Sequence, residues 1–305
     1  MEQVSVIAPA TVSNVVCGFD CLGFALEKPV DKIVLRRIDE TGVRIVNHDD
    51  FDLPSDPEKN AAGVTLLAML DASRVDFGFE LKSYKNIKPG SGIGSSAASS
   101  CGAAVAANEI LGRPFSKRAL AEFALEGENL ASGSRHADNV APCIFGGFTL
   151  VRSVEPLDIV SLRFPPLFVT VIHPQIEIRT ADARSVLPRE VPLASAVRNW
   201  ANLGALVAAL TRADYDLIGR SLEDLIVEPV RKSLIPKFDD VKAAALFVGA
   251  VGGGISGSGP SVFMLSRTSD TAAAVEKELQ NVYSKTGIEF YTYISRISGK
   301  GASIT

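Results

Sequence analysis

Short runs of apolar residues, separated by turn-forming residues, mark the first third of the chain, and this pattern is typical of β-strands. Runs rich in Val, Ile or Leu predict strands at residues 4–7, 30–38, 43–46 and 79–83. Longer segments repeat an apolar residue every three or four positions, which indicates helices. They predict helices over residues 60–73, 95–111 and 115–129. The second of these helices consists mostly of small side chains.

The rest of the chain mixes both patterns after a pair of prolines. Pro165 and Pro166 would stop a helix or a central strand, so we expect two domains, residues 1–165 and 166–305. Beyond the prolines the pattern predicts strands at residues 167–173, 261–266 and 290–294, and helices at 180–187, 192–211, 238–248 and 271–286. Strands and helices do not alternate strictly, so we expect an α+β fold rather than a doubly wound sheet.

Composition narrows the function classes mainly by exclusion. A chain of 305 residues is about twice the usual size of one domain, which favours two domains. With 47% hydrophobic and 22% charged residues it is neither disordered nor a coiled coil. The net charge of −4 argues against a protein that grips nucleic-acid phosphates. Its longest apolar stretches, such as residues 243–251, are far shorter than the roughly 20 residues that span a membrane.

The N-terminus and the cysteines indicate a cytoplasmic protein. The first residues lack the basic and then apolar order of a secretory signal. The four cysteines form no Cys-x-x-Cys pair, and only three histidines could join them. We therefore expect reduced thiols rather than a zinc site or a disulfide framework.

A glycine- and serine-rich segment before the helix at residues 95–111 is the first candidate for chemistry. It reads Pro89-Gly90-Ser91-Gly92-Ile93-Gly94-Ser95-Ser96-Ala97-Ala98. Glycines let a backbone approach a bulky anion, and a helix start directs free N–H groups and a positive dipole end at it. The hydroxyls of Ser95 and Ser96 could bind phosphate oxygens or a metal. No Gly-Lys-Ser/Thr follows, so this is not a Walker loop. The alternative is a plain turn with a serine helix cap.

A second glycine-rich segment, residues 252–260, contains a formal Gly-x-Gly-x-x-Gly. A dinucleotide-binding loop with that pattern would lead into a helix. Here Pro260 leads into the expected strand at residues 261–266. We therefore expect a flexible loop, rich in hydrogen-bond donors, that closes over a polar ligand, with a plain tight turn as the alternative.

Three blocks of the sequence resemble the GHMP kinase superfamily, named after galactokinase, homoserine kinase, mevalonate kinase and phosphomevalonate kinase. The blocks are Ala8-Pro9-Ala10-Thr11 with Gly18-Phe19-Asp20, the first glycine-rich segment, and Ile255-Ser256-Gly257-Ser258-Gly259-Pro260-Ser261. Two more segments resemble the homoserine kinase branch: Gly127-Glu128 followed by His136-Ala137-Asp138-Asn139-Val140-Ala141-Pro142, and Glu228-Pro229-Val230-Arg231 with Leu234-Ile235-Pro236. The chain departs from the family pattern at Val15-Val16-Cys17, where Asn-Leu-Gly is usual, and at Ile93, where Leu or Met is commoner.

This resemblance implies a two-domain GHMP kinase fold. Its N-terminal domain would be of the ribosomal-protein-S5-like kind, its C-terminal domain ferredoxin-like, and the active site would lie between them. It also implies a homodimeric enzyme, a cytoplasmic kinase that uses ATP and Mg²⁺ to phosphorylate the side-chain hydroxyl of L-homoserine. The product would be O-phospho-L-homoserine, in threonine biosynthesis from aspartate.

The resemblance also assigns residues to the nucleotide and the metal. The implied ATP-binding residues are Asn60, Lys88, Pro89, Gly90, Ser91, Gly92, Ile93, Gly94, Ser95, Ser96, Ala97 and Ala98. Mg²⁺ prefers hard oxygen ligands, and Ser96 and Glu128 are implied to supply them. A carboxylate at the end of a helix is unfavourable beside the negative dipole end, which favours a ligand role for Glu128 over a structural one. For Asn60, a helix N-cap is the alternative.

An amino-acid acceptor needs cations for its carboxylate and acidic or amide groups for its ammonium. Arg184 and Arg231 fit the first need, because a guanidinium binds a carboxylate through two hydrogen bonds. Asn14 and Asp20 fit the second.

Two more residues are assigned to the acceptor by similarity, namely His136 and Asn139. The implied catalytic residues are Ser96, Glu128, Asn139 and Arg184. No side chain is assigned as a general base, because phosphoryl transfer depends mostly on positioning and charge neutralisation.

Two other functions stay open. A GHMP kinase for a different small alcohol would be indicated if Arg184 and Arg231 lay far from the acceptor pocket. A catalytically silent nucleotide-binding module would be expected to lose its metal carboxylate or loop serines, but Glu128, Ser95 and Ser96 are all present.

Overall fold

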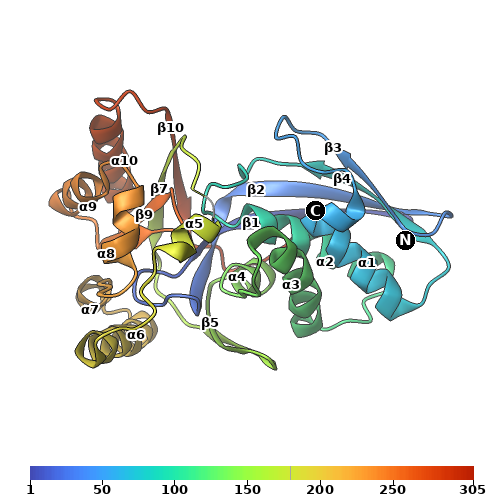
Figure 1. Cartoon of the computed structure of the whole chain (residues 1–305), viewed down its shortest axis with the longest axis horizontal. Helices are drawn as coiled ribbons and strands as arrows, with labels where there is room; N and C mark the ends of the chain where they lie inside the picture. The colour runs from blue at the N-terminus through green and yellow to red at the C-terminus, as the bar shows by residue number, and fades with distance from the viewer. Residues whose placement is uncertain (179) are drawn as a thin grey trace.

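The structure, a computed structural model, describes residues 1–178 and 180–305 and has two lobes side by side (Figure 1). A seven-stranded sheet forms the base of the first lobe, in the order β11-β1-β2-β4-β3, with β5 paired to β2 and β6 to β5. Its strands are β1 (Gln3–Ser13), β2 (Leu22–Ile38), β3 (Val43–Asn47), β4 (Gly78–Tyr84), β5 (Phe148–Val154), β6 (Leu157–Leu162) and β11 (Ser303–Ile304). Helices α1 (Ala61–Ser73), α2 (Ser95–Ile110), α3 (Lys117–Ser132) and α4 (Val140–Phe145), with a short 3₁₀ helix η1 (Pro57–Lys59), complete this lobe.

A four-stranded antiparallel sheet forms the second lobe, in the order β10-β7-β9-β8. Its strands are β7 (Phe168–Pro174), β8 (Gly252–Ile255), β9 (Val262–Ser266) and β10 (Phe290–Arg296). Helices lie between β7 and β8 and between β9 and β10, which gives the βαββαβ order of a ferredoxin-like domain. They are α5 (Thr180–Ser185), α6 (Leu193–Arg212), α7 (Tyr215–Ser221), α8 (Glu228–Arg231), 3₁₀ helix η2 (Lys232–Leu234), α9 (Phe238–Phe247) and α10 (Ser269–Tyr283). The expected α+β class is confirmed.

The two lobes share a hydrophobic core because the second sheet is apolar on both faces. Successive strand residues point to opposite faces. Val171 and Phe263 join the core of the first lobe, whereas Ile172 and Met264 lie in a separate core. The ring of Phe24 from β2 lies 5.7 Å from that of Phe263, which joins the lobes directly.

The end of the chain returns to the first lobe. Ile297 pairs with Leu26, and β11 pairs with β1 through Ile304 and Val6. The division at residues 165 and 166 falls between β6 and β7 and stays a prediction for the domain boundary.

The sequence analysis predicted some strands too short and missed others. The strands expected at residues 4–7 and 30–38 are only parts of β1 and β2, which are 11 and 17 residues long. Most of β1 beyond Ile7 is buried on both faces, so no alternation of apolar and polar residues marks it. Strands β5 and β6 were not predicted.

The second glycine-rich segment is a strand in its first half, so the expectation of a continuous loop was wrong there. Gly252–Ile255 forms β8, paired with β9. A Cβ at Gly253 would lie 2.0 Å from the carbonyl oxygen of Phe263, so only glycine permits this close pairing. In the described part of the chain, no helix has the length and apolar character to cross a bilayer.

Candidate active site

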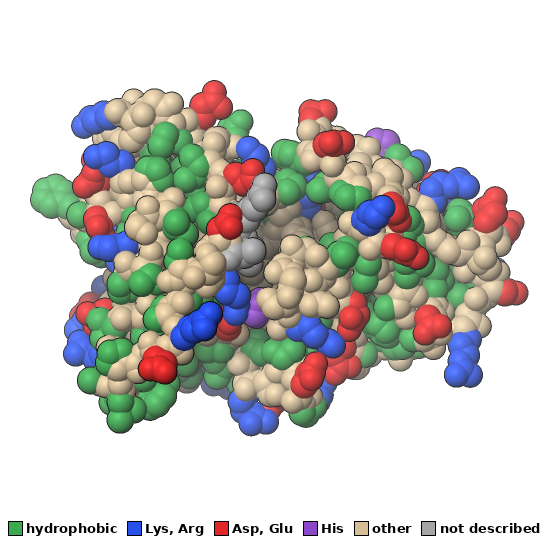
Figure 2. All heavy atoms as spheres, viewed as in Figure 1, with side chains coloured by type: hydrophobic (Ala, Val, Ile, Leu, Met, Phe, Trp, Pro, Cys, Tyr) green, Lys and Arg blue, Asp and Glu red, His purple; other side chains and the backbone are tan. Residues whose placement is uncertain are grey.

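A cleft of about 660 Å³ lies between the lobes and hollows the face seen in Figure 2. Most of the sequence-predicted site residues line it. They are Asn14, Asp20, Asn60, Pro89, Gly90, Ser91, Gly92, Gly94, Ser95, Ser96, Glu128, His136, Asn139, Arg184 and Arg231. Four others from the first glycine-rich segment and its flank do not line it: Lys88, Ile93, Ala97 and Ala98.

Two carbonyl groups of the loop at residues 89–94 are bonded to other parts of the chain. The carbonyl oxygen of Gly92 accepts a hydrogen bond from the Ser256 hydroxyl at 2.7 Å, and that of Ile93 accepts one from the Thr11 N–H at 3.1 Å. Within the described chain, the backbone N–H groups of residues 92–97 have no hydrogen-bond partner. Free N–H groups at the start of a helix, together with its dipole, suit the binding of an anion.

Two glycines of this loop are required by close packing. Gly94 has a left-handed backbone (φ +73°), and a Cβ there would lie 2.0 Å from the Thr11 hydroxyl of β1. Gly92 (φ +80°) would place a Cβ 2.6 Å from the carbonyl oxygen of Gly259. The loop is therefore held between β1 and the second glycine-rich segment.

A buried ion pair stabilises the start of α2, directly after the loop, and the sequence analysis missed it. Lys85, at 1% side-chain exposure, pairs with Asp31 of β2. The Lys85 ammonium also donates to the Ser95 carbonyl at 3.1 Å and to the Ser99 hydroxyl at 2.8 Å. Nothing in the local sequence links Lys85 to Asp31, since they are 54 positions apart.

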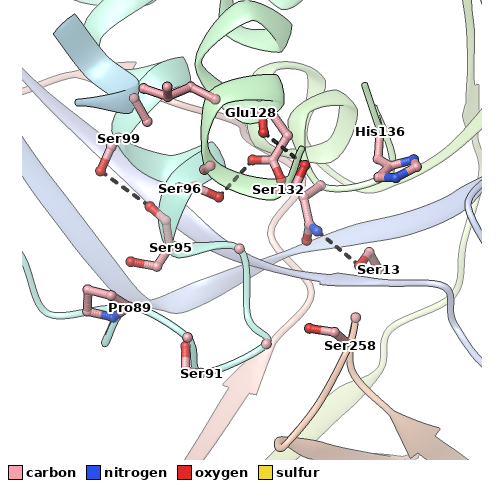
Figure 3. Close-up of a pocket in the computed structure, with 18 of the residues that line it drawn as sticks. Ser13, Pro89, Ser91, Ser95, Ser96, Ser99, Glu128, Ser132, His136 and Ser258 are labelled. Carbon is pink, nitrogen blue, oxygen red and sulfur yellow. Dashed lines mark hydrogen bonds between the residues drawn. The ribbon is translucent and has the colours of Figure 1, made fainter. Parts of the chain in front are cut away.

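Glu128 of α3 and Ser96 of α2 face each other at the cleft (Figure 3). The Ser96 hydroxyl donates to Glu128 Oε2 at 2.7 Å. Burial raises the pKa of Glu128 to about 7, and the nearby Asp138 adds to this, while the Ser96 hydrogen bond opposes it. The described residues contain no cluster of three His, Cys, Asp or Glu suited to a metal. A Mg²⁺ ion here would need most of its oxygen ligands from phosphates and water, which is usual for Mg²⁺ with a nucleotide.

Charged side chains from both lobes meet at the other end of the cleft. Arg184 Nη2 lies 3.0 Å from both carboxylate oxygens of Asp20 and 2.9 Å from Nε2 of His136. Burial lowers the pKa of His136, so its ring is neutral at pH 7. The Arg184 Nε is buried without a partner among the described residues, which leaves a donor available to an anionic ligand.

Arg231 is fixed by the backbone of the second lobe. Its Nε donates to the Ala183 carbonyl at 2.9 Å, and its Nη1 donates to that of Gly257 at 3.2 Å. The guanidinium groups of Arg231 and Arg184 lie 5.1 and 5.7 Å from the ring centre of Phe19. Both cations thus lie against one aromatic ring, and two guanidinium groups side by side suit the binding of a carboxylate.

Asn139 is locked in one orientation between two hydroxyls of β1. Its Oδ1 accepts from Thr11 at 2.7 Å, and its Nδ2 donates to Ser13 at 3.0 Å. The adjacent Asp138 lines the cleft and is buried, and burial, with the charge of Asp20, raises its pKa to about 7. Ser13 and Asp138 were not assigned to the site by the sequence analysis.

Asn14 begins a left-handed turn at the position where the chain departs from the family pattern. Asn14, Val15 and Val16 have φ angles of 68°, 42° and 62°, which is costly for side chains branched at Cβ. The Asn14 side chain donates to the Gly257 carbonyl at 2.7 Å and accepts from the Asp20 N–H at 2.9 Å. It therefore orders the loop that carries Asp20, besides lining the cleft.

Asn60 and Lys88 have structural partners. Asn60 caps α1 by accepting from the Ala62 N–H at 3.0 Å, and its amide donates to the Pro54 carbonyl at 2.8 Å. The N-cap alternative thus describes its geometry. The Lys88 ammonium donates to Oε1 of Gln175, in the second lobe, at 2.6 Å. Nucleotide contacts for either residue stay a prediction.

Two family models match the chain on either side of this cleft. The model for the GHMP kinases N terminal domain matches residues 60–147, and that for the GHMP kinases C terminal region matches residues 206–285. Homoserine kinase of Chloroherpeton thalassium is 44% identical over 318 residues and covers the whole of both chains. Homoserine kinase of Methanocella arvoryzae is 41% identical over 100% of this chain and 98% of its own.

The chain belongs to the homoserine kinase family of GHMP kinases. A crystal structure of homoserine kinase from Cytophaga hutchinsonii superposes with a TM-score of 0.96 at 47% identity, over 100% of this chain and 98% of that one. An L. major mevalonate kinase, at 16% identity and a TM-score of 0.73, shares the fold alone. The GHMP kinase fold and the family resemblance expected from the sequence are confirmed.

Proposed function

We propose that the chain transfers the γ-phosphoryl group of ATP to the side-chain hydroxyl of L-homoserine. The observation that carries this proposal is the cleft itself. One end offers the N–H groups of residues 92–97, which have no hydrogen-bond partner among the residues that the structure describes, and the other offers two arginines beside an aspartate. An anion-binding loop and a pocket for a zwitterion within one cleft suit transfer of phosphate to an amino acid.

Each end of the cleft would bind one substrate. The loop at residues 89–96 would bind the phosphates of ATP, with the apolar side chains of Leu53, Pro54 and Leu130 available for its base. Arg184 and Arg231 would bind the homoserine carboxylate, and Asp20 its ammonium group. The amide of Asn139, held by Thr11 and Ser13, would position the hydroxyl acceptor.

Mg²⁺ would be held by the Glu128 carboxylate and the Ser96 hydroxyl, which already lie in hydrogen-bond contact. When bound, the ion would neutralise charge on the transferred phosphate. Glu128 must ionise to bind it, so this carboxyl group should release roughly three-quarters of a proton per site when Mg²⁺ and ATP bind near pH 6.5. We assign no general base, since positioning and charge neutralisation carry most of phosphoryl-transfer catalysis.

The product, O-phospho-L-homoserine, places the enzyme in threonine biosynthesis from aspartate, and a cytoplasmic location suits that pathway. A kinase for a neutral alcohol is disfavoured, because Arg231 is buried and bonds only backbone carbonyls among the described residues, so such an acceptor would leave its charge unpaired. A silent binding module is disfavoured by the presence of Glu128, Ser95 and Ser96 in the cleft.

The decisive experiment is a coupled assay of ADP release with homoserine, threonine, serine and mevalonate as acceptors. Homoserine should give the highest kcat/KM, by at least an order of magnitude. Equal or better use of mevalonate would refute the proposal, and so would ADP release that no acceptor increases.

A further inference from the structure

A second cavity, of about 10 Å³, adjoins the end of the cleft that carries the arginines. Asn14, Arg231 and Gly257 line both spaces, whereas Glu228 lines only the small one. Glu228 begins the short helix α8 of the second lobe, and Arg231 ends it (Figure 1). The two charged residues of this helix therefore border the same small space.

One carboxylate oxygen of Glu228 is left without a protein partner. The side chain is 15% exposed, and its Oε1 accepts a hydrogen bond from the Lys242 ammonium of α9. Its Oε2 is buried and has no hydrogen-bond partner within the part of the chain that the structure describes. An unpaired buried acceptor is unfavourable, and buried polar groups are nearly always bonded to protein or to an ordered water. We therefore expect the partner of Oε2 in the cavity that Glu228 lines.

Gly254 of β8 makes room for this carboxylate. A Cβ at Gly254 would lie 2.4 Å from Glu228 Oε2 and 3.0 Å from Cγ2 of Val16. Gly254 is not among the residues with a left-handed backbone, so its φ angle does not require glycine. The lack of a side chain instead lets Oε2 reach the wall of the cavity, which Val16 and Ile255 also line.

The cavity has the size and the polarity to hold one water molecule. A buried water needs roughly 10–15 Å³ of space and two to four polar partners. Glu228 supplies an acceptor, and Arg231 supplies donors. Among the described residues, Arg231 donates only to the carbonyls of Ala183 and Gly257, through Nε and Nη1. A guanidinium has five N–H groups, so three remain, one for a water and two for a carboxylate.

We propose that a water molecule in this cavity bridges Glu228 Oε2 and the Arg231 guanidinium, and that Glu228 thereby positions Arg231 for the acceptor carboxylate. The inference rests on the proposed function, in which Arg231 binds the carboxylate of homoserine. A direct ion pair with Glu228 would occupy the guanidinium and compete with the substrate. A bond through water holds the guanidinium in place and leaves two N–H groups for the substrate. Glu228 is therefore a positioning residue that acts through Arg231.

A crystal structure of the ligand-free enzyme tests the water without any measurement of activity. We expect one ordered water within about 3 Å of both Glu228 Oε2 and an Arg231 nitrogen. A cavity that holds no water, or a Glu228 side chain turned out to solvent, would overturn the proposal. In Gly254→Ala the new Cβ should displace the carboxylate, and the water should be lost from its place.

Steady-state kinetics of Glu228→Gln tests the positioning of Arg231. The Lys242 ammonium needs an acceptor, so it should keep the amide oxygen and turn the amide NH₂ to the place of Oε2. The water then loses the acceptor that orients it. The KM for homoserine should rise on the order of tenfold, while kcat and the KM for ATP should change by less than about twofold. Gly254→Ala should give the same pattern.

Glu223→Gln is the matched control, because Glu223 also pairs with a cation, Arg198 at 3.1 Å, but does not line the cavity. Its KM for homoserine should equal that of wild type. A wild-type KM for homoserine in both Glu228→Gln and Gly254→Ala would overturn the proposal. An equal rise in the KM for both substrates would also overturn it, because a general loss of structure gives that result. Failure of the proposed function would appear instead in the wild-type enzyme, as ADP release that homoserine does not increase.

Discussion

Replacing Glu128 with glutamine should stabilise the ligand-free protein and at the same time slow its reaction. Glu128 is 7% exposed, and burial raises the pKa of its carboxyl group to about 7 from an ordinary value of 4.5. Folding therefore favours the protonated acid and disfavours the ionised form that a metal needs. Glutamine removes the charge and can still accept the hydrogen bond from Ser96.

The size and the pH window of the stability effect follow from the shift in pKa. Because the pKa is higher in the folded state, the folded protein binds this proton more tightly than the unfolded chain. The penalty is absent below about pH 4.5, grows as the pH rises, and is complete above about pH 7. It amounts to on the order of 3 kcal/mol at pH 8. Glu128→Gln should thus be more stable than wild type at pH 8 and close to it at pH 5.

The catalytic effect should have the opposite sign. Loss of the metal carboxylate should lower turnover on the order of a hundredfold, and raised Mg²⁺ should restore part of it. Urea unfolding without ligands at pH 5 and pH 8, together with the ADP-release assay, measures both effects. Glu122→Gln is the matched control, because Glu122 lies on the same helix with a 48% exposed side chain, and neither quantity should change. Turnover within a few-fold of wild type, or a loss of stability at pH 8, would refute the assignment.

Three further predictions concern the two ends of the cleft. Gly92→Val should weaken ATP binding at least tenfold in calorimetric titration, because the valine side chain would meet the Gly259 carbonyl and displace the loop. Unchanged affinity in a folded variant would show that the loop is not part of the site. Wild type should prefer homoserine to its decarboxylated amino alcohol by roughly a thousandfold in kcat/KM, and Arg231→Lys should lose much of its homoserine activity. Similar use of both acceptors by wild type would contradict the zwitterion pocket. Lys88→Met should raise the KM for ATP several-fold with little change in kcat, because the hydrogen bond from Lys88 to Gln175 holds the flank of the loop. Lys88→Arg should behave as wild type, and an equal effect of both variants would exclude that role.

The sequence indicated the class of fold and most of the cleft, because local signals marked both. The glycines and serines at residues 89–96 predict an anion loop through backbone geometry alone, and that geometry is local. The longer helices were placed nearly correctly because their apolar spacing repeats over several turns, as in α6, whereas the short helices α4, α7 and α8 were not predicted. Local patterns do not show which distant segments meet at one site. The family resemblance, now confirmed, indicated which sequence blocks come together there.

Long-range partners could not be read from the sequence. The ion pair of Lys85 with Asp31 joins residues 54 positions apart, and Ser13 reaches Asn139 across 126 positions. Asn14 and Asn60 carry side chains that suit a ligand, yet both also bond the backbone, and only the fold decides between these uses. The strand at Gly252–Ile255 was missed because its reason, close approach to β9, lies in the partner strand.

The path of the chain between the lobes limits how the cleft opens. The chain enters the second lobe through β7 and leaves it through β10, and these strands pair over seven positions, from Phe168 with Arg296 to Pro174 with Phe290. Strand β7 also pairs with β9, so both crossings of the chain belong to the four-stranded sheet of the second lobe. The crossings lie next to each other, and Phe24 packs on Phe263 between the lobes, so the lobes should separate by rotation about this shared edge rather than by sliding. Ser256 follows β8 in the second lobe and donates a hydrogen bond to the Gly92 carbonyl of the first lobe. Wide opening of the cleft would have to break that bond before ATP could leave.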